Sequence, residues 1–263
     1  MQKEIVMEVS ALKKYYAKRT KEFVLKGVDF KVYKGQIFSL LGSNGAGKTT
    51  AVKTLATLLK PTEGKVTICG YNLSKDAKRI RRCISLTGQY AAVDENLSGR
   101  ENLHLIGRLK HVKDYKEKAE EYLTLFELQS AANRRVKTYS GGMKRKLDIA
   151  MSLLGDPQII FLDEPTTGLD PQSRRKLWDI IENLAHEKGI TIFLTTQYLD
   201  EAERLADYIA VLEGGVIVAG GTLDELKRMM PDWKPVMVES APSLEEVFLS
   251  LVNKPQNEEK RRA

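Results

Sequence analysis

The chain of 263 residues carries a formal net charge of +7, with 42% hydrophobic and 29% charged residues. These proportions are typical of a soluble globular protein, long enough for one large domain or for one domain with a sub-lobe. No apolar run reaches about 18 residues, and the first residues lack the apolar core of a signal peptide, so we expect a chain that neither spans a membrane nor is secreted. Lysines and arginines alternate with acids, as in KDYKEKAEEY, which favours a solvated surface over a nucleic-acid interface.

The cysteines and histidines show no metal-binding spacing. Cys69 and Cys83 lack a C-x-x-C pattern, and we expect both to be reduced and mostly buried. His104, His111 and His186 are isolated, which favours surface or packing roles over metal ligation.

The first predicted elements are strands. Residues 4–10 and 23–33 are rich in β-forming residues, and a turn at Lys34 and Gly35 leads into a buried strand, QIFSLL. Between the first two strands, LKKYYAKRT predicts a polar loop whose tyrosines offer a face for stacking on a base.

The next stretch, GSNGAGKTT, fits the phosphate-loop pattern G-x-x-x-x-G-K-[ST] between a strand and a helix. Glycines let the loop turn its backbone N–H groups toward a polyphosphate at the positive end of the helix. Lys48 then reaches the phosphates, and the Thr49 hydroxyl ligates Mg²⁺. The residues predicted to bind nucleotide here are Gly42, Ser43, Asn44, Gly45, Ala46, Gly47, Lys48, Thr49 and Thr50.

Further strand and helix signals follow this loop. Pro61 and Gly64 end the helix, and KVTICGYNL predicts a strand and a turn. A short basic helix over residues 75–82 precedes a strand that ends at Gln89, after which residues 90–97 are irregular and partly apolar.

The sequence pattern of residues 94–157 predicts helices. Ser98 with Glu101 predicts a capping box, and Asp114 with Glu117 predicts a second helix start of the same kind. The second helix has a buried stripe at helical spacing, formed by Ala119, Tyr122, Leu123 and Phe126. A third helix begins at residues 140–142, ends at residues 155–157 and carries the same spacing at Leu147, Ala150, Met151 and Leu154.

The α/β pattern returns with QIIFLDEP, a buried parallel-type strand that ends in two carboxylates. Asp163 fits the Mg²⁺-holding aspartate of phosphate-loop ATPases. Glu164 is placed to accept a proton from an attacking water.

The remaining elements are a helix over residues 174–187, a strand that ends at Gln197, a helix over 199–207 and a hairpin that turns at Gly214 and Gly215. Ser243 predicts the start of a terminal amphipathic helix.

Taken together in this order, the phosphate loop, Gln89, YSGGM, IIFLDEP, GLD and TTQYLDEAE resemble the ATP-binding-cassette (ABC) family of ATPases over residues 4–252. Within the family, the chain is most similar to the daunorubicin-resistance type of ATP-binding subunit, which exports drugs or other hydrophobic compounds. Three stretches carry this similarity: LTGQYAAVDENLSGRENL, YSGGMKRKLDIA and LTTQYLDEAERLAD.

The resemblance implies a fold and a domain organisation. The fold class is α/β, a phosphate-loop NTPase with a mixed, mainly parallel sheet, an N-terminal antiparallel β subdomain and an inserted helical subdomain. One domain over residues 1–252 comprises the core (4–93 and 158–222), the helical subdomain (94–157) and a C-terminal extension (223–252), followed by a tail (253–263).

The resemblance also implies roles for single residues. Tyr16 would stack on adenine, with Tyr15 as the alternative. Gln89 would contact Mg²⁺ and the attacking water, Asp163 would hold the metal through water, and Glu164 would be the general base.

Ser140, Gly141 and Gly142 stand at a helix start, which is an anion site. In the family this site meets ATP held by a second copy, so two subunits would face head to tail, and Asp170 would carry contacts across that dimer. The dimer would consist of two copies of this chain, or of this chain and a related one.

Two positions depart from the family pattern. Met143 stands where glutamine is most frequent, and Gln197 replaces the usual histidine. An amide can still donate a hydrogen bond to phosphate but cannot carry a proton near neutral pH, so we expect hydrolysis to depend on Glu164 with no imidazole step.

The function that follows is an ATP-hydrolysing motor of an exporter, located at the cytoplasmic face of the membrane, with ATP and Mg²⁺ as cofactors, separate integral membrane permease chains as partners and no nucleic acid. The stretch from Tyr90 to Leu97 would line the groove for the permease. The alternatives are a soluble ABC ATPase acting on ribosomes or DNA and a nucleotide-binding regulator without turnover.

Overall fold

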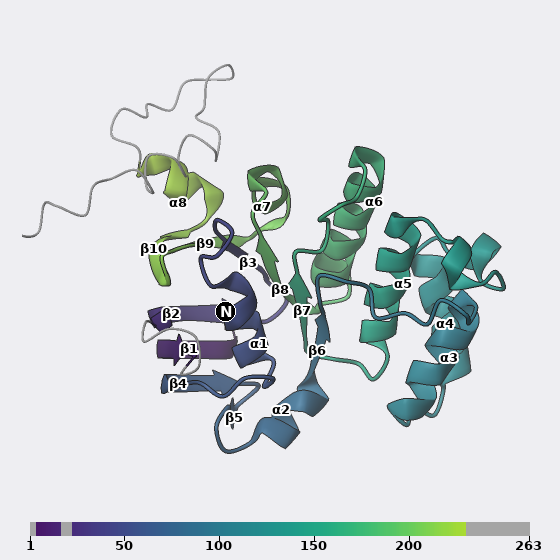
Figure 1. The fold of residues 1–263 in the computed structure, drawn as a ribbon, viewed down its shortest axis with the longest axis horizontal. Coiled ribbons are helices and arrows are strands. Elements are labelled where there is room, and N and C mark those ends of the chain that lie inside the picture. The colour runs from purple at the N-terminus through teal and green to yellow at the C-terminus, as the bar shows by residue number, and fades with distance from the viewer. Residues whose placement is uncertain (1–3, 17–22, 230–263) are drawn as a thin grey trace, which may run out of the picture.

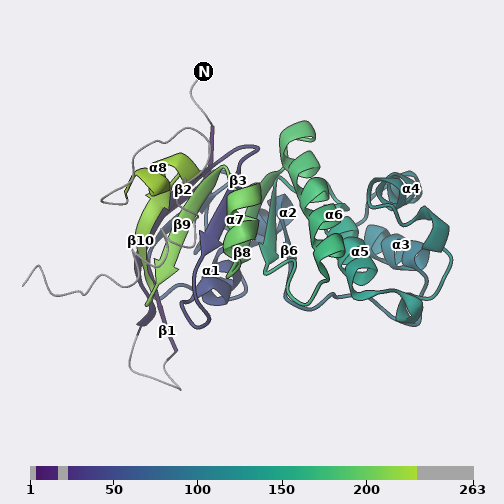
Figure 2. The ribbon, with the colours of Figure 1, turned by 90° about the horizontal axis from the view of Figure 1, so that it is seen from above.

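The computed structural model describes residues 4–16 and 23–229, and these form two sheets and a set of helices (Figure 1). The antiparallel sheet lies at one end of the molecule, the larger sheet in the middle and a lobe of helices at the other end. Figure 2 shows the same order from above.

The first sheet is antiparallel and has the strand order β2-β1-β4-β5. Its strands are β1 (Ile5–Tyr15), β2 (Phe23–Tyr33), β4 (Glu63–Ile68) and β5 (Tyr71–Asn72). Strand β1 is longer than predicted and takes in four residues of the expected polar loop. The reason is pairing on both sides, because Leu12 is fully buried, Lys13 pairs with Glu63, and Tyr15 pairs with Phe23.

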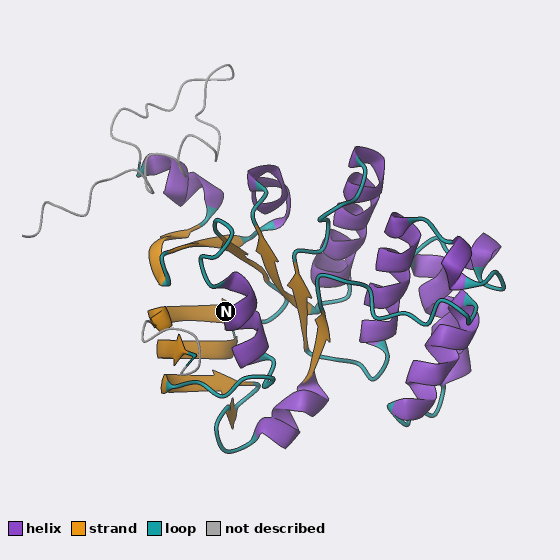
Figure 3. Cartoon of the chain, in the orientation of Figure 1, coloured by secondary structure: helices purple, strands orange, loops and turns teal. Residues whose placement is uncertain are grey.

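The second sheet has the order β10-β9-β3-β8-β7-β6 and is parallel except for β10, as predicted. Its strands are β3 (Ile37–Leu41), β6 (Ile84–Thr87), β7 (Ile159–Asp163), β8 (Thr191–Thr196), β9 (Tyr208–Glu213) and β10 (Val216–Gly221). Every residue of β3, β7 and β8 is buried, since helices and the first sheet cover both faces. Parallel strands end at the same edge, so the loops after β3, β6, β7 and β8 meet there (Figure 3).

The helices are α1 (Lys48–Leu55), α2 (Ala77–Cys83), α3 (Gly99–Leu109), α4 (Tyr115–Leu125), α5 (Gly141–Leu153), α6 (Pro171–Glu182), α7 (Leu199–Leu205) and α8 (Leu223–Arg228). The predicted stripe of α4 is buried against α3 and α5. Helix α6 begins at Pro171, earlier than predicted, because Asp170 caps it and proline is suited to the first turn. Helix α7 ends at Leu205, and Asp207 instead accepts a hydrogen bond from the Ile37 N–H.

The capping prediction is right for one helix and wrong for another. Ser98 and Glu101 form the expected capping box of α3. Asp114 precedes α4 but makes no side-chain cap hydrogen bond, and its carboxylate lies 4.0 Å from the Lys118 ammonium instead. The two cysteines are half-buried and free. The predicted terminal helix lies outside the described residues, and among those described no helix is long and apolar enough to cross a bilayer.

Candidate functional site

The phosphate loop connects buried β3 to α1, and its glycines are required by the space around them. A Cβ on Gly42 would stand 2.3 Å from the Leu212 carbonyl oxygen. Gly47 has φ of 111°, the left-handed region that favours glycine. The loop backbone can therefore pack directly against Leu212 and turn into α1 at Gly47.

Lys48 is nearly fully buried at this helix start. Its ammonium donates to the carbonyl oxygens of Gly42 at 2.8 Å and Ser43 at 3.1 Å. It also forms an ion pair with Glu164, with 3.2 Å between Nζ and Oε1. A lysine held this way presents its charge inside the loop, which suits a phosphate ligand.

Thr49, Gln89 and Asp163, the three residues predicted to hold Mg²⁺, come from three elements and lie next to one another. The Thr49 hydroxyl donates to Asp163 Oδ1 at 3.3 Å, and the Gln89 amide donates to Thr49 Oγ1 at 3.5 Å. Asp163 also accepts a hydrogen bond from the Thr195 hydroxyl at 2.6 Å, which fixes the orientation of its carboxylate. Oxygen donors of this kind fit the preference of Mg²⁺.

Thr49 and Gln89, together with Lys48 and Glu164, line one open cavity of about 200 Å³ at the carboxyl edge of the sheet. The lining consists of Val24, Asn44, Gly45, Gly47, Lys48, Thr49, Thr50, Gln89 and Glu164. Glu164 reaches it because its backbone has φ of 49° directly after β7, with its N–H held by Thr195.

The two candidate tyrosines differ in their surroundings. Tyr16 lies beside the loop, with 3.4 Å between its hydroxyl and Thr50 Oγ1. The Tyr15 ring packs edge-on against Phe23 instead. This arrangement favours Tyr16 over Tyr15 as the stacking residue. Ser43, also predicted to bind nucleotide, turns its hydroxyl toward Glu213 at 2.9 Å.

Ser140, Gly141 and Gly142, at the start of α5, do not line the cavity of their own chain. Ser140 caps α5 by accepting the Met143 N–H. A Cβ on Gly142 would be 2.7 Å from Ser173 Oγ, and Ser173 in turn is held by Asp170, the cap of α6. Hydrogen bonds that the hydroxyl and the N–H of Ser173 donate to the Asp170 carboxylate lower the pKa of Asp170 below its usual range. Ser140 and Asp170 thus stand at two neighbouring helix starts outside the phosphate loop.

Gln197 follows β8 by one residue and is half-buried. It is not among the residues that line the cavity around Lys48.

Sequence reasoning missed three buried charged residues around the site. Arg145 and Asp148 of α5 pair with each other, at 3.3 Å. Glu201 of α7 accepts hydrogen bonds from the Thr166 hydroxyl and the Trp178 ring nitrogen, and burial raises its pKa. The only signal in the sequence was the presence of charged residues in helices next to the motifs. That signal does not identify the residues that they contact.

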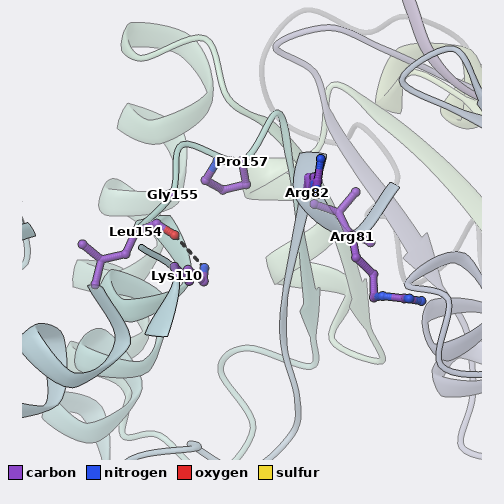
Figure 4. A pocket seen from close by; sticks show the side chains of 7 residues that line it. Arg81, Arg82, Lys110, Leu154, Gly155 and Pro157 are labelled. Atoms are coloured by element: carbon purple, nitrogen blue, oxygen red, sulfur yellow. Dashed lines mark hydrogen bonds between the residues drawn. The ribbon is translucent and has the colours of Figure 1, made fainter. Parts of the chain in front are cut away.

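A second cavity, of about 380 Å³, opens at the opposite end of β6 (Figure 4). Its cationic lining comes from Arg81, Arg82 and Lys110. The Lys110 ammonium donates to the carbonyl oxygens of Ser152, in the last turn of α5, and of Leu154, which follows the helix. No residue predicted from the motifs lines it.

The sheet order, the phosphate loop and the paired carboxylates define a phosphate-loop nucleotide-binding cassette. The family model for the ABC transporter matches residues 25–167, just over half of the chain. The chain therefore belongs to the ABC transporter family.

Relatives with known names agree with this membership. The daunorubicin resistance ATP-binding protein DrrA3 of Streptomyces coeruleorubidus is 48% identical over 77% of this chain and 65% of its own. The daunorubicin/doxorubicin resistance ATP-binding protein DrrA of Streptomyces peucetius is 50% identical over 78% of this chain and 62% of its own. The doxorubicin resistance ATP-binding protein DrrA of Mycobacterium tuberculosis is 46% identical, with 87% and 69% covered. This chain thus spans between 62% and 69% of the length of these relatives.

Solved structures share the fold. An ATP-binding subunit of an ABC transporter is 31% identical, with a TM-score of 0.79 over 94% of this chain and 99% of its own. An ATP-binding cassette solved as a dimer in a post-hydrolysis state bound to ADP and Pi is 28% identical, with a TM-score of 0.74 over 82% of this chain and 98% of its own.

Proposed function

We propose that the chain binds and hydrolyses ATP as the motor subunit of a membrane exporter. The observation that carries the proposal is the single cavity in which Lys48 and Thr49 of the phosphate loop meet Gln89 and Glu164. A lysine charge, a hydroxyl and a carboxylate at one edge of a sheet are the parts that phosphoryl transfer to water requires.

Each residue has a role that its position supports. The loop N–H groups and Lys48 hold the phosphates, and Tyr16 packs against the base. Thr49, Gln89 and Asp163 hold Mg²⁺, which would neutralise charge on the phosphates. Glu164 accepts the proton of the attacking water, and its ion pair with Lys48 holds the carboxylate beside the phosphate loop.

Two copies of the chain are needed for a complete site under this proposal. Ser140, Gly141 and Gly142 form a helix start that suits phosphate, yet they do not line the cavity of their own chain. A similar cassette, solved as a dimer bound to ADP and Pi, supports dimerisation. Asp170, at the neighbouring helix start, contacts the second copy.

The partner is an integral membrane permease, and the cargo is drug-like or hydrophobic. Relatives named for daunorubicin and doxorubicin resistance support this class of cargo. The Tyr90 side chain, 89% exposed, lies in the segment after Gln89, and Leu105 and Leu109 of α3 are also exposed. Exposed apolar side chains suit contact with a permease segment, which would place the chain at the cytoplasmic face of the membrane.

The proposal is tested by turnover and by copurification. We expect Glu164→Gln to reduce steady-state ATP hydrolysis by about a hundredfold or more, since general-base catalysis contributes that much. We expect Gln197→Ala to keep most of the rate, because an amide transfers no proton. Near-normal turnover in Glu164→Gln contradicts the assignment of the base. Extraction of the native chain in mild detergent without any membrane protein contradicts the exporter.

A further inference from the structure

Arg145 of α5 is buried and distributes its guanidinium over two loops of the site. It donates to the Gly88 carbonyl oxygen at 2.5 Å, immediately before Gln89. It also donates to the carbonyl oxygens of Pro165 at 2.9 Å and Asp163 at 3.4 Å, on either side of Glu164. One side chain therefore satisfies backbone acceptors at the ends of both β6 and β7.

Asp148, one turn later on the same helix, completes the arrangement. Its Oδ2 lies 3.3 Å from Arg145 Nη1, and its Oδ1 accepts the Ala92 N–H at 3.1 Å. Ala92 belongs to the segment after Gln89 in which Tyr90 is exposed. The pair is thus bonded both to the stretch from Tyr90 to Leu97, here called the partner-contact segment, and to the backbone around the carboxylates.

The geometry leaves little freedom for relative movement. All three nitrogens of the guanidinium are used, and a planar fork fixes direction as well as distance. Both side chains are about 5% exposed, so a broken bond would leave a buried charge or carbonyl unsatisfied. A shift of α5, which begins at Ser140, must therefore move Gly88 and Pro165 with it or break these bonds.

We propose that Arg145 and Asp148 are positioning residues that keep the Gln89 loop, the β7 carboxylates and the Ser140 end of α5 in one geometry. Through Ala92 the same pair passes a displacement of the partner-contact segment to the backbone around Glu164. This inference rests on the proposed ATP hydrolysis, for which it names how the parts of the site are held together.

The test separates positioning from stability. Arg145→Lys keeps the positive charge but removes the planar guanidinium. Asp148→Asn keeps the size and shape of the side chain but removes its negative charge. We expect the kcat for ATP to fall about tenfold to a hundredfold in each, as misplaced catalytic groups typically cause, with the KM for Mg-ATP within about twofold, because the phosphate loop is untouched. Glu127→Gln is the matched control. Glu127 follows α4 and forms an ion pair, at 2.8 Å, with Lys146, the neighbour of Arg145 on α5. The substitution weakens that ion pair and should leave kcat unchanged.

A double variant guards against misfolding. Arg145→Met with Asp148→Leu replaces the buried pair by apolar side chains, which commonly preserves stability. Positioning predicts a near-native melting temperature with kcat still low, whereas a purely structural pair predicts that kcat recovers with stability. Recovered kcat in the double variant, or native kcat in both single variants, overturns the inference. If the native chain itself does not hydrolyse ATP, the proposed function fails instead.

Discussion

Glu164 is held in a left-handed backbone conformation at the end of a fully buried strand. Such a conformation costs a non-glycine residue roughly 1 kcal/mol or more, and two hydrogen bonds from its N–H to Thr195 help to hold it. The benefit is direction, because the carboxylate turns toward Lys48 rather than along the sheet.

Asp148 gives a prediction about pH. Burial raises its pKa to about 6, against the opposing effects of Arg145 and the Ala92 N–H. Arg145 is the charged group that faces it, and Arg145 is itself surrounded by Asp163 and Glu201. Below pH 6 the carboxyl becomes neutral and the pair weakens, so we expect kcat to fall with a midpoint near pH 6.

Stability should change in the opposite direction, which separates the two effects. A folded-state pKa above the ordinary value of 3.8 means that the stabilising contribution of Asp148 is complete below pH 3.8 and is lost as the pH rises through 6. Acidification should therefore lower kcat and, at the same time, increase the contribution of Asp148 to the free energy of unfolding. The measurement is a pH–rate profile beside urea titrations, and an acid limb that persists unchanged in Asp148→Asn would assign it elsewhere.

The residues of the motifs could be predicted from the sequence, while those that hold them could not. Gly42 to Thr50 are contiguous, and Asp163 and Glu164 end one strand, so local pattern is sufficient. Arg145 meets Gly88 across 57 positions of the chain, and no periodicity predicts that contact. The choice between Tyr15 and Tyr16 likewise depended on where the first sheet places each ring.

Two helix starts of the same sequence type provide a matched prediction for the elements. Ser98 caps α3 through the Glu101 N–H, whereas Asp114 makes no cap bond to α4. We expect Ser98→Ala to lower the free energy of unfolding by about 1 kcal/mol and Asp114→Ala to change it by less than about half of that. Urea titrations of both variants measure this, and equal losses would contradict the difference seen in the structure.

Element types could be predicted more reliably than element ends. Strand β7 follows from a continuous apolar run and the stripe of α4 from helical periodicity, and the structure confirms both. Strand β1 continues to Tyr15 because β2 and β4 pair with it from both sides, and α6 starts at Pro171 because Asp170 caps it. Such ends depend on neighbours distant in sequence, which a local pattern does not contain.

At the scale of the whole molecule, the proposed function requires a second copy, because Ser140 and Gly141 do not line the Lys48 cavity of their own chain. We expect Glu164→Gln with Mg-ATP to form a dimer in size-exclusion chromatography with light scattering, because bound ATP then persists between the two copies. Adding Gly141→Asp to this variant should abolish the dimer through repulsion of phosphate. The fold should tolerate this change, since the nearest atom to a Cβ there is Leu169 Cδ2 at 3.8 Å.

The control for this experiment is the affinity of the monomer for ATP. Gly141→Asp leaves the phosphate loop intact, so titration with a fluorescent ATP analogue should give a dissociation constant within about twofold of the parent. Loss of the dimer with retained affinity places Gly141 on the ATP of the second copy. A dimer that persists in the Gly141→Asp variant would show that the two copies meet through another surface, and the start of α5 would then have no phosphate to bind.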